Sequence, residues 1–299
     1  MTVGENARPK RSVGGAEAPS TAFGRNADEQ TIRGFGAEWS RFDQSELEEQ
    51  ELRAHFDAYF RIFPWDVLPS GAVGFDAGCG SGRWAKLVAR RVGTLHCVDA
   101  SEDALATARR NLAGQPNVRF HLAYVDCMPL AEGEMDFGYS LGVLHHIPDT
   151  EAALAACVRH LKPGAPFLCY LYYRFDNRPA WYRALWAATD APRRVISRMP
   201  AALKHAVTDG IAASVYWPLA RAAAIAEYLG ANVENVPLAH YRRSSFYCMR
   251  TDALDRFGTR LEQRFAAEEI RAMFERVGLE RVRIGESAPY WCAVGYRRT

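Results

Sequence analysis

The amino-acid sequence predicts an α/β protein, in which a parallel sheet has helices on both faces and a long helical insertion comes late in the chain. Between residues 73 and 173, short β-rich runs alternate with amphipathic helical runs, which is the pattern of a parallel sheet. About 90 residues without a clear strand then intervene before the pattern resumes. The composition, 48% hydrophobic and 24% charged over 299 residues, excludes a wholly disordered or fibrous chain.

The strands are expected at residues 73–77, 94–99, 118–125, 136–141 and 167–173, with two closing strands at 281–284 and 290–296. Helices are expected over residues 82–92, after Ser101, after Thr150, and over residues 266–277. Ser101 is a favourable N-cap because its hydroxyl can accept an N–H of the first helical turn. Gly278 ends the last of these helices, since glycine readily adopts the left-handed backbone of a C-cap.

The chain divides into four predicted parts. Residues 1–25 form a disordered tail, because the first twenty lack an apolar run and are rich in Gly, Pro and Ser. Residues 26–65 form an acidic N-terminal helical segment, with helical spacing of apolar residues over 45–60. Residues 66–173 together with 266–299 form the core. Residues 174–265 form a helical lid, because a structureless loop of that length is improbable in a compact domain.

Charge and cysteine usage exclude several classes of protein. A net charge of +2 and a pI near 8.2 give no global basic field for nucleic acid, which argues against a nucleic-acid partner. The most apolar long stretch, residues 211–229, is interrupted by Pro218, Arg221 and Glu227, so no membrane span is expected. Seven scattered cysteines without a CxxC pair favour reduced thiols in a cytoplasmic protein, and no metal site is indicated.

A glycine-rich segment follows the first predicted strand, with Asp76, Gly78, Gly80 and Gly82 spaced as D-x-G-x-G-x-G. Glycines remove the Cβ atoms that would block a ligand, and the N–H groups at the start of the next helix can bind its polar end. The third glycine comes one residue earlier than in the dinucleotide fingerprint G-x-G-x-x-G. No Gly-Lys-Ser/Thr phosphate loop occurs in this segment, which argues against a nucleoside triphosphate.

This segment resembles motif I of the class I S-adenosylmethionine-dependent methyltransferases, and the following segments resemble the rest of the family pattern. Asp99 ends the second strand, Asp126 follows the third, residues 135–149 continue from the fourth, and Lys162-Pro-Gly164 precedes the fifth. The resemblance covers residues 73–173 and 266–298, although Ala165 stands where many members have a second glycine. It implies a Rossmann-like seven-stranded sheet, mostly parallel with the last strand antiparallel, and S-adenosylmethionine as cofactor.

The resemblance also implies roles for individual residues. Asp99 would accept hydrogen bonds from the ribose hydroxyls, or else cap the following helix. Asp126 would bind the adenine amino group, or else form a turn, and Asp76 would organise the glycine loop or reach the methionine ammonium through water. Trp39 would wall the cofactor site, or else anchor the acidic helix. The complete set of expected cofactor-binding residues is Asp76, Gly78, Cys79, Gly80, Gly82, Asp99, Ala100, Asp126, Cys127, Leu141 and Trp39.

Candidates for catalysis follow the fourth and fifth strands, because open α/β sheets bind ligands at the carboxyl ends of their strands. His145 is the first candidate for a general base and His146 the second, since a histidine pKa lies in the useful range. The alternative is a histidine packed against the sheet or bonded to the backbone. Tyr172 is a catalytic candidate and Tyr173 a substrate-binding one, the alternative being ordinary alternation at a strand end.

The lid is expected to decide the acceptor. Residues 174–250 contain eleven Lys/Arg and five Asp/Glu, a net charge of +6. This predicts an electropositive lid over an anionic, partly apolar small molecule, with Arg242 and Arg243 as anion contacts. One alternative is a solvated helical face. In the other, Arg242, Arg243 and residues 252–257 are salt-bridged scaffolding between the lid and the final helix.

The expected activity is therefore methyl transfer to an O, N or C nucleophile of a small-molecule acceptor, mainly by proximity and alignment. Two alternatives stay open. A non-methylating enzyme on the same scaffold would catalyse a cyclisation or rearrangement, or an attack at another sulfonium carbon. An RNA methyltransferase has only the local charge of the insertion in its favour. The oligomeric state is not indicated.

Overall fold

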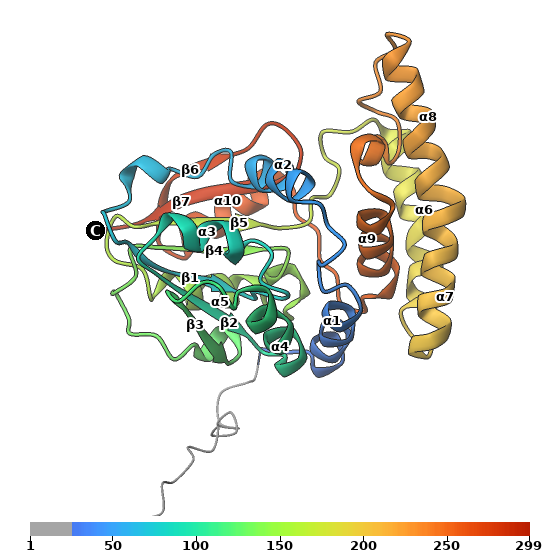
Figure 1. Ribbon diagram of the computed structural model, residues 1–299. Coiled ribbons are helices and arrows are strands. Elements are labelled where there is room, and N and C mark those ends of the chain that lie inside the picture. Colours follow the sequence, from blue (N-terminus) through green and yellow to red (C-terminus); the bar gives the residue numbers. More distant parts are fainter. Residues whose placement is uncertain (1–25) are drawn as a thin grey trace, which may run out of the picture.

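A computed structural model of the chain describes residues 26–299, and the tail predicted at 1–25 lies outside the described residues. Its core is a seven-stranded sheet of order β3-β2-β1-β4-β5-β7-β6 (Figure 1). The strands are β1 Val73–Ala77, β2 Thr94–Asp99, β3 Val118–Leu122, β4 Phe137–Leu141, β5 Pro166–Tyr170, β6 Leu279–Ile284 and β7 Cys292–Arg297. Strand β7 runs antiparallel to both of its neighbours, while β1 to β5 are parallel. The predicted sheet and its antiparallel last strand are confirmed.

Two of the expected strands end three residues earlier than predicted. The third ends at Leu122, because the chain then enters the short 3-10 turn Val125–Cys127. The fifth ends at Tyr170, so Tyr172 and Tyr173 lie beyond the sheet, and only an isolated bridge joins Tyr173 to Phe265. Both segments lead from the carboxyl end of a strand toward the cavity described below.

Helices cover both faces of the sheet. On one face lie α2 (Glu49–Tyr59), α3 (Ala85–Val88) and α4 (Glu102–Asn111), whose apolar side chains pack with those of β2 and β4. On the other face lie α5 (Thr150–Val158) and α10 (Ala267–Arg276), which pack on β5. The predicted helix over residues 82–92 is reduced to α3 and the 3-10 turn Ala89–Arg91. Gly82 has a φ of +76°, so the glycine turn extends into that range before the helix begins.

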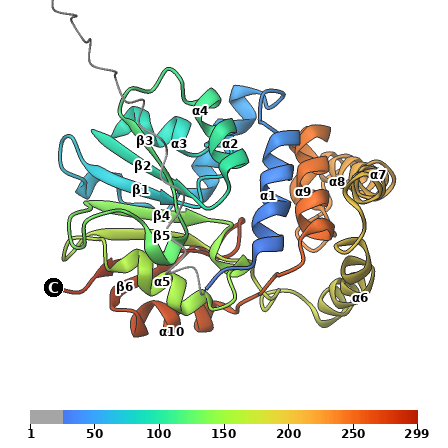
Figure 2. The ribbon, with the colours of Figure 1, turned by 90° about the horizontal axis from the view of Figure 1, so that it is seen from below.

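Residues 174–265 form a helical body beside the core. Its elements are α6 Ala180–Ile196, α7 Ala201–Ile211, the π-helical turn Ala212–Tyr216, α8 Trp217–Tyr228, the 3-10 turn Ala239–Arg243 and α9 Phe246–Gly258. Figures 1 and 2 show α9 side by side with the N-terminal helix α1 (Glu29–Arg41), and α6, α7 and α8 on the outside. Helix α1 therefore lies between the sheet and the helices of this body.

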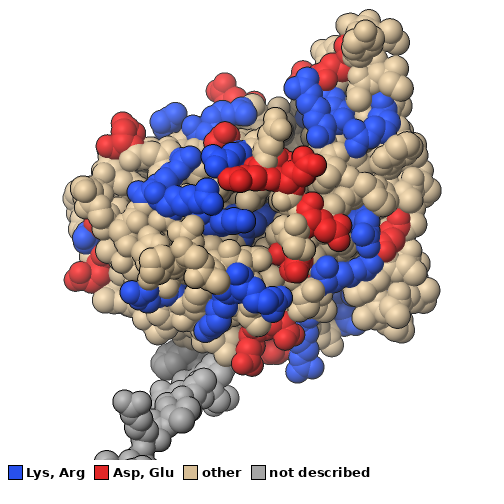
Figure 3. Space-filling view, in the orientation of Figure 1, with Lys and Arg blue, Asp and Glu red and all other residues tan. Residues whose placement is uncertain are grey.

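The described residues contain no helix that is long and apolar enough to cross a membrane. All seven cysteines are free, and only Cys127 is not buried. Acidic and basic side chains lie interspersed over the face shown in Figure 3.

Candidate functional site

A large cavity lies between the carboxyl ends of the strands and the helices of the lid. Its volume is about 1180 Å³, whereas pockets for one small ligand usually measure about 300–1,000 Å³. Loops from β1, β2 and β4 line one part of it, and α1 and the lid line the rest. The aromatic side chains in its wall are Phe35, Trp39, Tyr59, Trp84, Tyr124, Tyr170, Tyr172, Tyr173, Phe175, Tyr182, Trp186, Tyr216, Tyr241, Phe257 and Tyr290. The cavity can therefore hold a cofactor and a partly apolar second molecule.

The glycine loop after β1 forms one wall of this cavity. Gly78, Gly80 and Gly82 have φ angles of +81°, +54° and +76°, a backbone conformation that favours glycine. A Cβ on Gly80 would lie 2.9 Å from Nε1 of Trp39, which itself lines the cavity. A Cβ on Gly78 would lie 2.5 Å from Val143. The loop therefore forms a concave wall, the cofactor cradle, which side chains at Gly78 or Gly80 would disrupt.

Asp99, at the end of β2, is bonded to this loop. One carboxylate oxygen accepts the N–H of Gly80 and the other accepts the N–H of Ser101, each at 2.8 Å. The N-cap of α4 is Ser101, whose hydroxyl accepts the N–H of Ala104. Helix capping thus does not explain Asp99. Burial raises its pKa, against the opposing effect of the backbone N–H groups, and its carboxylate lines the cavity, where it can accept from a diol.

The structure brings most, but not all, of the expected cofactor residues to the cavity. Those that line it are Trp39, Gly78, Cys79, Gly80, Asp99, Ala100 and Leu141. Four others do not line it. Gly82 packs against Leu112, and Cys127 lies in the turn after β3. Asp76 is 1% exposed beneath the loop, where burial raises its pKa to about 8.

Asp126 also lies behind the cavity wall, although its neighbour Val125 lines it. Its Oδ1 is buried and has no hydrogen-bond partner among residues 26–299. A buried acceptor without a donor normally has an explanation, because it costs about 1–3 kcal/mol. The amino group of a bound purine would supply such a donor after a small shift of the turn. Together with the Gly80 cradle and Asp99, this orphaned acceptor fits a nucleoside cofactor.

The expected catalytic role of His145 needs correction. Its ring is completely buried, lies 3.9 Å between centroids from the ring of Tyr172, and is not part of the cavity wall. Burial lowers its pKa well below the ordinary value, so the ring is neutral. The chain turns in a 3-10 helix at Leu144–His146, which puts the next histidine at the cavity instead.

His146 has a defined tautomer. Its Nδ1 lies 2.6 Å from the carbonyl oxygen of Leu261. Since a carbonyl oxygen can only accept, Nδ1 carries the proton and donates a hydrogen bond to that oxygen. Nε2 has no hydrogen-bond partner within the described chain and lies 3.9 Å from Oδ1 of Asp255. The hydroxyl of Tyr172 donates to the same carboxyl group. His146, Asp255 and Tyr172 thus form a proton-accepting group at the cavity wall.

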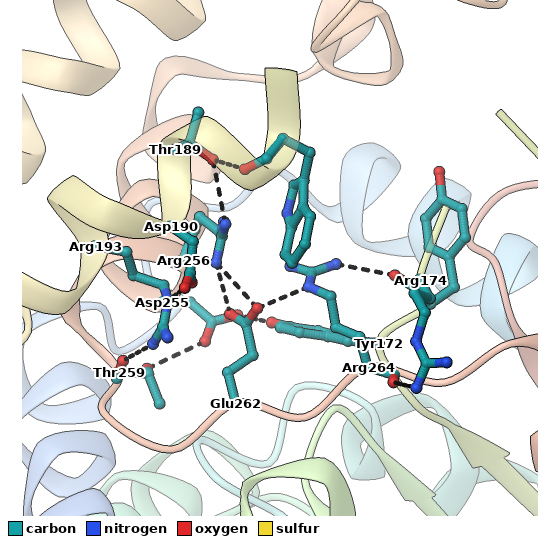
Figure 4. Close-up of polar contacts among 12 residues, drawn as sticks. Tyr172, Arg174, Thr189, Asp190, Arg193, Asp255, Arg256, Thr259, Glu262 and Arg264 are labelled. Atoms are coloured by element: carbon teal, nitrogen blue, oxygen red, sulfur yellow. Dashed lines mark hydrogen bonds and ion pairs between the residues drawn. The ribbon is translucent and has the colours of Figure 1, made fainter. Parts of the chain in front are cut away.

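A buried ion triad supports this group (Figure 4). Glu262 accepts from Arg256 at 3.0 Å and from Arg264 at 2.7 Å, and its side chain is only 3% exposed. The guanidinium group of Arg264 lies over the rings of Tyr172 and Trp186. The triad therefore holds the segment after α9 against the strand end that carries Tyr172, and residues 252–257 are partly scaffolding, as one alternative predicted.

The expected anion contacts also change. Arg242 and Arg243 both bond to Glu227, at 2.8 and 3.1 Å, and Arg243 lies outside the cavity wall with a side chain 79% exposed. These two arginines lower the pKa of Glu227 to about 2. Asp190 and Asp209 are likewise each bonded to two arginines. Much of the lid's positive charge is therefore compensated internally and does not favour an anionic acceptor.

Tyr173 does line the cavity, where its ring packs against Phe175 and Tyr290. Several charged residues of the wall were not predicted as site residues from the sequence, among them Glu38, Arg83, Asp252 and Asp255. Arg83 directly follows the glycine loop, and Glu38 directly precedes Trp39, so proximity to predicted site residues was the available signal. Asp252 and Asp255 had the three-residue spacing of one helix face.

One group of side chains in the described part of the chain is close enough to share a metal ion. The ligand atoms of Glu51, His55 and Cys248 lie within 4.8 Å of one another at the contact of α2 with α9. Cys248 is buried, which raises the pKa of its thiol and opposes the thiolate that a metal needs.

Comparisons with known proteins agree with the geometry. Residues 75–169 match the family described as "Methyltransferase domain". A ubiquinone biosynthesis O-methyltransferase from Thiobacillus denitrificans is 35% identical over 107 residues, which are 35% of this chain and 44% of that protein. Its counterpart from Hydrogenovibrio crunogenus is 28% identical over 165 residues, 54% of this chain and 66% of that protein. The chain thus matches less than two thirds of the length of either relative.

A solved structure of a SAM-dependent methyltransferase from Thermotoga maritima gives a TM-score of 0.49 at 13% identity, over 89% of this chain and 100% of that one.

Proposed function

We propose that the chain, whose residues 75–169 match the family described as "Methyltransferase domain", is a class I S-adenosylmethionine-dependent enzyme that transfers a methyl group to an O, N or C nucleophile of a small molecule bound under the lid. The observation that supports this proposal best is the cavity of about 1180 Å³, which extends from the glycine loop and Asp99 to the aromatic wall of the lid. S-Adenosylmethionine, when bound, supplies an activated methyl group as a sulfonium.

The core side of the cavity binds the nucleoside in this proposal. Asp99 accepts the ribose hydroxyls. Asp126 lies next to Val125 of the cavity wall, and its orphaned oxygen would accept from a purine amino group after a small shift of the turn Val125–Cys127. Trp39 covers Gly80 and excludes water from the loop. Arg83 lines the cavity next to the loop and forms no ion pair with any described residue, so it is available for a carboxylate such as that of a methionine.

The lid side binds and aligns the acceptor. Alignment of two reactants can lower a barrier by roughly 7–11 kcal/mol, so positioning is the main requirement. A nucleophile that carries a proton also needs an acceptor for it. Asp255, with His146 behind it and Tyr172 bonded to it, lies in the wall where such a proton can be transferred. Burial raises the pKa of Asp255, which makes it a better base near neutral pH.

The test uses the whole chain with methyl-labelled S-adenosylmethionine and a metabolite extract. Methyl transfer predicts one S-adenosylhomocysteine per labelled product, with a mass gain of about 14 Da, one methyl replacing one hydrogen, and both signals should depend on cofactor binding. Asp99→Ala serves as the variant impaired in cofactor binding, and it should reduce S-adenosylhomocysteine and the labelled product together. Product formation without S-adenosylhomocysteine would instead favour a cyclisation or rearrangement.

A further inference from the structure

Three acidic side chains line the part of the cavity where α1 faces α9. Glu38 comes from α1, and Asp252 and Asp255 come from α9, the two helices that lie side by side in Figure 2. Asp252 and Asp255 are three residues apart and therefore share one face of α9. Glu38 is only 4% exposed although it lines the cavity. We call these residues the acidic cluster.

The acidic cluster has no ion pair with a lysine or arginine among residues 26–299. In residues 26–299, Glu38 has no hydrogen bond or ion pair of its side chain. Asp252 has no lysine or arginine partner there, and its contacts are the thiol of Cys248, 3.9 Å away, and the side chain of Tyr241. Asp255 accepts from Tyr172 and lies 3.9 Å from His146. Three other acids of the lid differ, since Asp190, Asp209 and Glu227 are each bonded to two arginines.

Burial and mutual repulsion act on the acidic cluster in the same direction. Burial raises the pKa of Glu38, and the neighbouring Asp255 and Asp252 raise it further. Burial also raises the pKa of Asp252 to about 6. Desolvated carboxyl groups close to one another are stabilised by a positive charge placed between them.

The nearest cations point to other partners. The guanidinium of Arg83 lies over the rings of Trp39 and Trp84, at 5.7 and 4.4 Å from their centroids. Nζ of Lys204 donates to the carbonyl oxygen of Gly258 at 3.1 Å. Neither Arg83 nor Lys204 forms an ion pair with Glu38, Asp252 or Asp255 among the described residues. A bound cation could therefore supply the close positive charge that these carboxyl groups lack.

A separate observation also indicates a ligand at this place. His146 is only 5% exposed, lines the cavity, and has an Nε2 without a hydrogen-bond partner in the described chain. The aromatic rings of Trp39, Tyr170 and Tyr216 line the same cavity. Aromatic faces and carboxylates together are the surroundings that bind organic cations.

A bare metal ion fits less well. Among the described residues, only Glu51, His55 and Cys248 have ligand atoms within 4.8 Å of one another, and the acidic cluster is not so close. An ammonium group has up to three N–H donors and an organic body that can contact the aromatic wall. The wider spacing therefore suits an organic amine.

We propose that the acceptor is a small amine with an apolar body, bound as an ammonium ion by Glu38, Asp252 and Asp255 and methylated on its nitrogen. This inference rests on the proposed function. The bound ammonium first loses one proton to the carboxylate of Asp255. The nitrogen lone pair then forms the new N–C bond, and the C–S bond breaks with its electron pair remaining on sulfur, which leaves a neutral thioether. The methylated ammonium carries the positive charge.

The first experiment measures binding without turnover. The whole chain is saturated with S-adenosylhomocysteine and titrated calorimetrically with 2-phenylethylamine and tryptamine, and with the alcohol and carboxylate analogues of each. At least one amine should bind ten times more tightly than both of its analogues. Glu38→Gln and Asp252→Asn should remove that preference while S-adenosylhomocysteine still binds. Glu234→Gln is the control, because this acid lines the cavity but its side chain is 64% exposed.

The binding results decide the inference in either direction. If neither amine exceeds its analogues, or if Glu38→Gln and Asp252→Asn leave the preference intact, an amine acceptor is wrong. If Glu38→Gln weakens S-adenosylhomocysteine and not the amine, Glu38 serves the cofactor and the assignment also fails.

The second experiment identifies the charge of the natural product. Methyl-labelled material from the metabolite extract is passed over cation- and anion-exchange resins at pH 7. An amine acceptor predicts label on the cation exchanger, and label on the anion exchanger or in the flow-through would contradict it. If no label is transferred and no S-adenosylhomocysteine forms, the proposed function fails, while the binding experiment still tests whether the cavity prefers amines.

Discussion

Gly80→Ala tests whether the glycine loop is the cofactor cradle. Two costs are expected from the structure. An alanine at a φ of +54° is in the left-handed region, which costs roughly 1–2 kcal/mol. Its Cβ would also lie 2.9 Å from Nε1 and 3.0 Å from Cε2 of Trp39, and such overpacking costs roughly 1–3 kcal/mol. The free energy of unfolding should therefore fall by about 2–5 kcal/mol.

Gly71→Ala is the matched control. Gly71 has a φ of +74°, and no other side chain or distant backbone atom lies within 4 Å of the place that a Cβ would take, so it shares the backbone cost without the contact. Its free energy of unfolding should fall by only about 1–2 kcal/mol. In the double variant Gly80→Ala/Trp39→Ala the contact is gone, so the two changes should be less than additive.

The assay combines denaturant unfolding with calorimetric titration of S-adenosylhomocysteine. Gly80→Ala should weaken the affinity at least tenfold, or about 1.4 kcal/mol, because the displaced Trp39 forms part of the same wall. Gly71→Ala should leave the affinity within twofold. If Gly80→Ala is folded and binds as tightly as the parent protein, the loop does not hold the cofactor, and the assignment of the whole wall is wrong.

Three further changes test other parts of the site. Asp99→Ala should weaken S-adenosylhomocysteine roughly 10- to 150-fold, since bonds to a charged group contribute about 1.5–3 kcal/mol; unchanged calorimetric affinity would contradict the ribose assignment. Glu262→Gln should lower the free energy of unfolding by about 3–5 kcal/mol, because two buried guanidinium groups lose their anion. Burial raises the pKa of Glu262 but its arginines lower it more, so the pair's contribution is present above the ordinary pKa and is lost as pH falls through the folded value, which acid titration of both proteins would reveal. His146→Ala should reduce kcat with little change in cofactor affinity, whereas an equal loss of kcat in a folded His145→Ala protein would restore the original candidate.

The sheet and the glycine loop could be predicted because they depend on local sequence. Alternation of strand and helix patterns determines a parallel sheet, and Gly80 is required wherever the backbone adopts a positive φ against Trp39. The choice between His145 and His146 could not be predicted, since it depends on how the 3-10 turn Leu144–His146 rotates the chain. A turn that rotated the chain by one more residue would bury His146 and bring His145 to the cavity wall.

Charge pairing in the lid was equally hidden from the sequence. Counting charges gave a net +6 for residues 174–250, but pairing is decided by which helices meet. The loop between α8 and the 3-10 turn Ala239–Arg243 folds back and brings Arg242 and Arg243 to Glu227. Conversely, Asp252 could be interpreted as a solvent-facing helical residue until α1 was placed against α9. A net charge therefore says little about the charge that faces a ligand.

Helix α1 connects the two halves of the cavity. Trp39 covers the glycine loop. The preceding residue, Glu38, belongs to the acidic cluster, whose other two members lie on α9. The same helix is bonded to the lid through Arg41 and Asp209, whose nitrogen and oxygen lie 2.6 Å apart. Because Trp39 and Glu38 belong to one helix, a shift of α1 on cofactor binding would move both residues together. Any resulting coupling between cofactor and acceptor affinities must be reciprocal, since both are measured against the same two positions of α1.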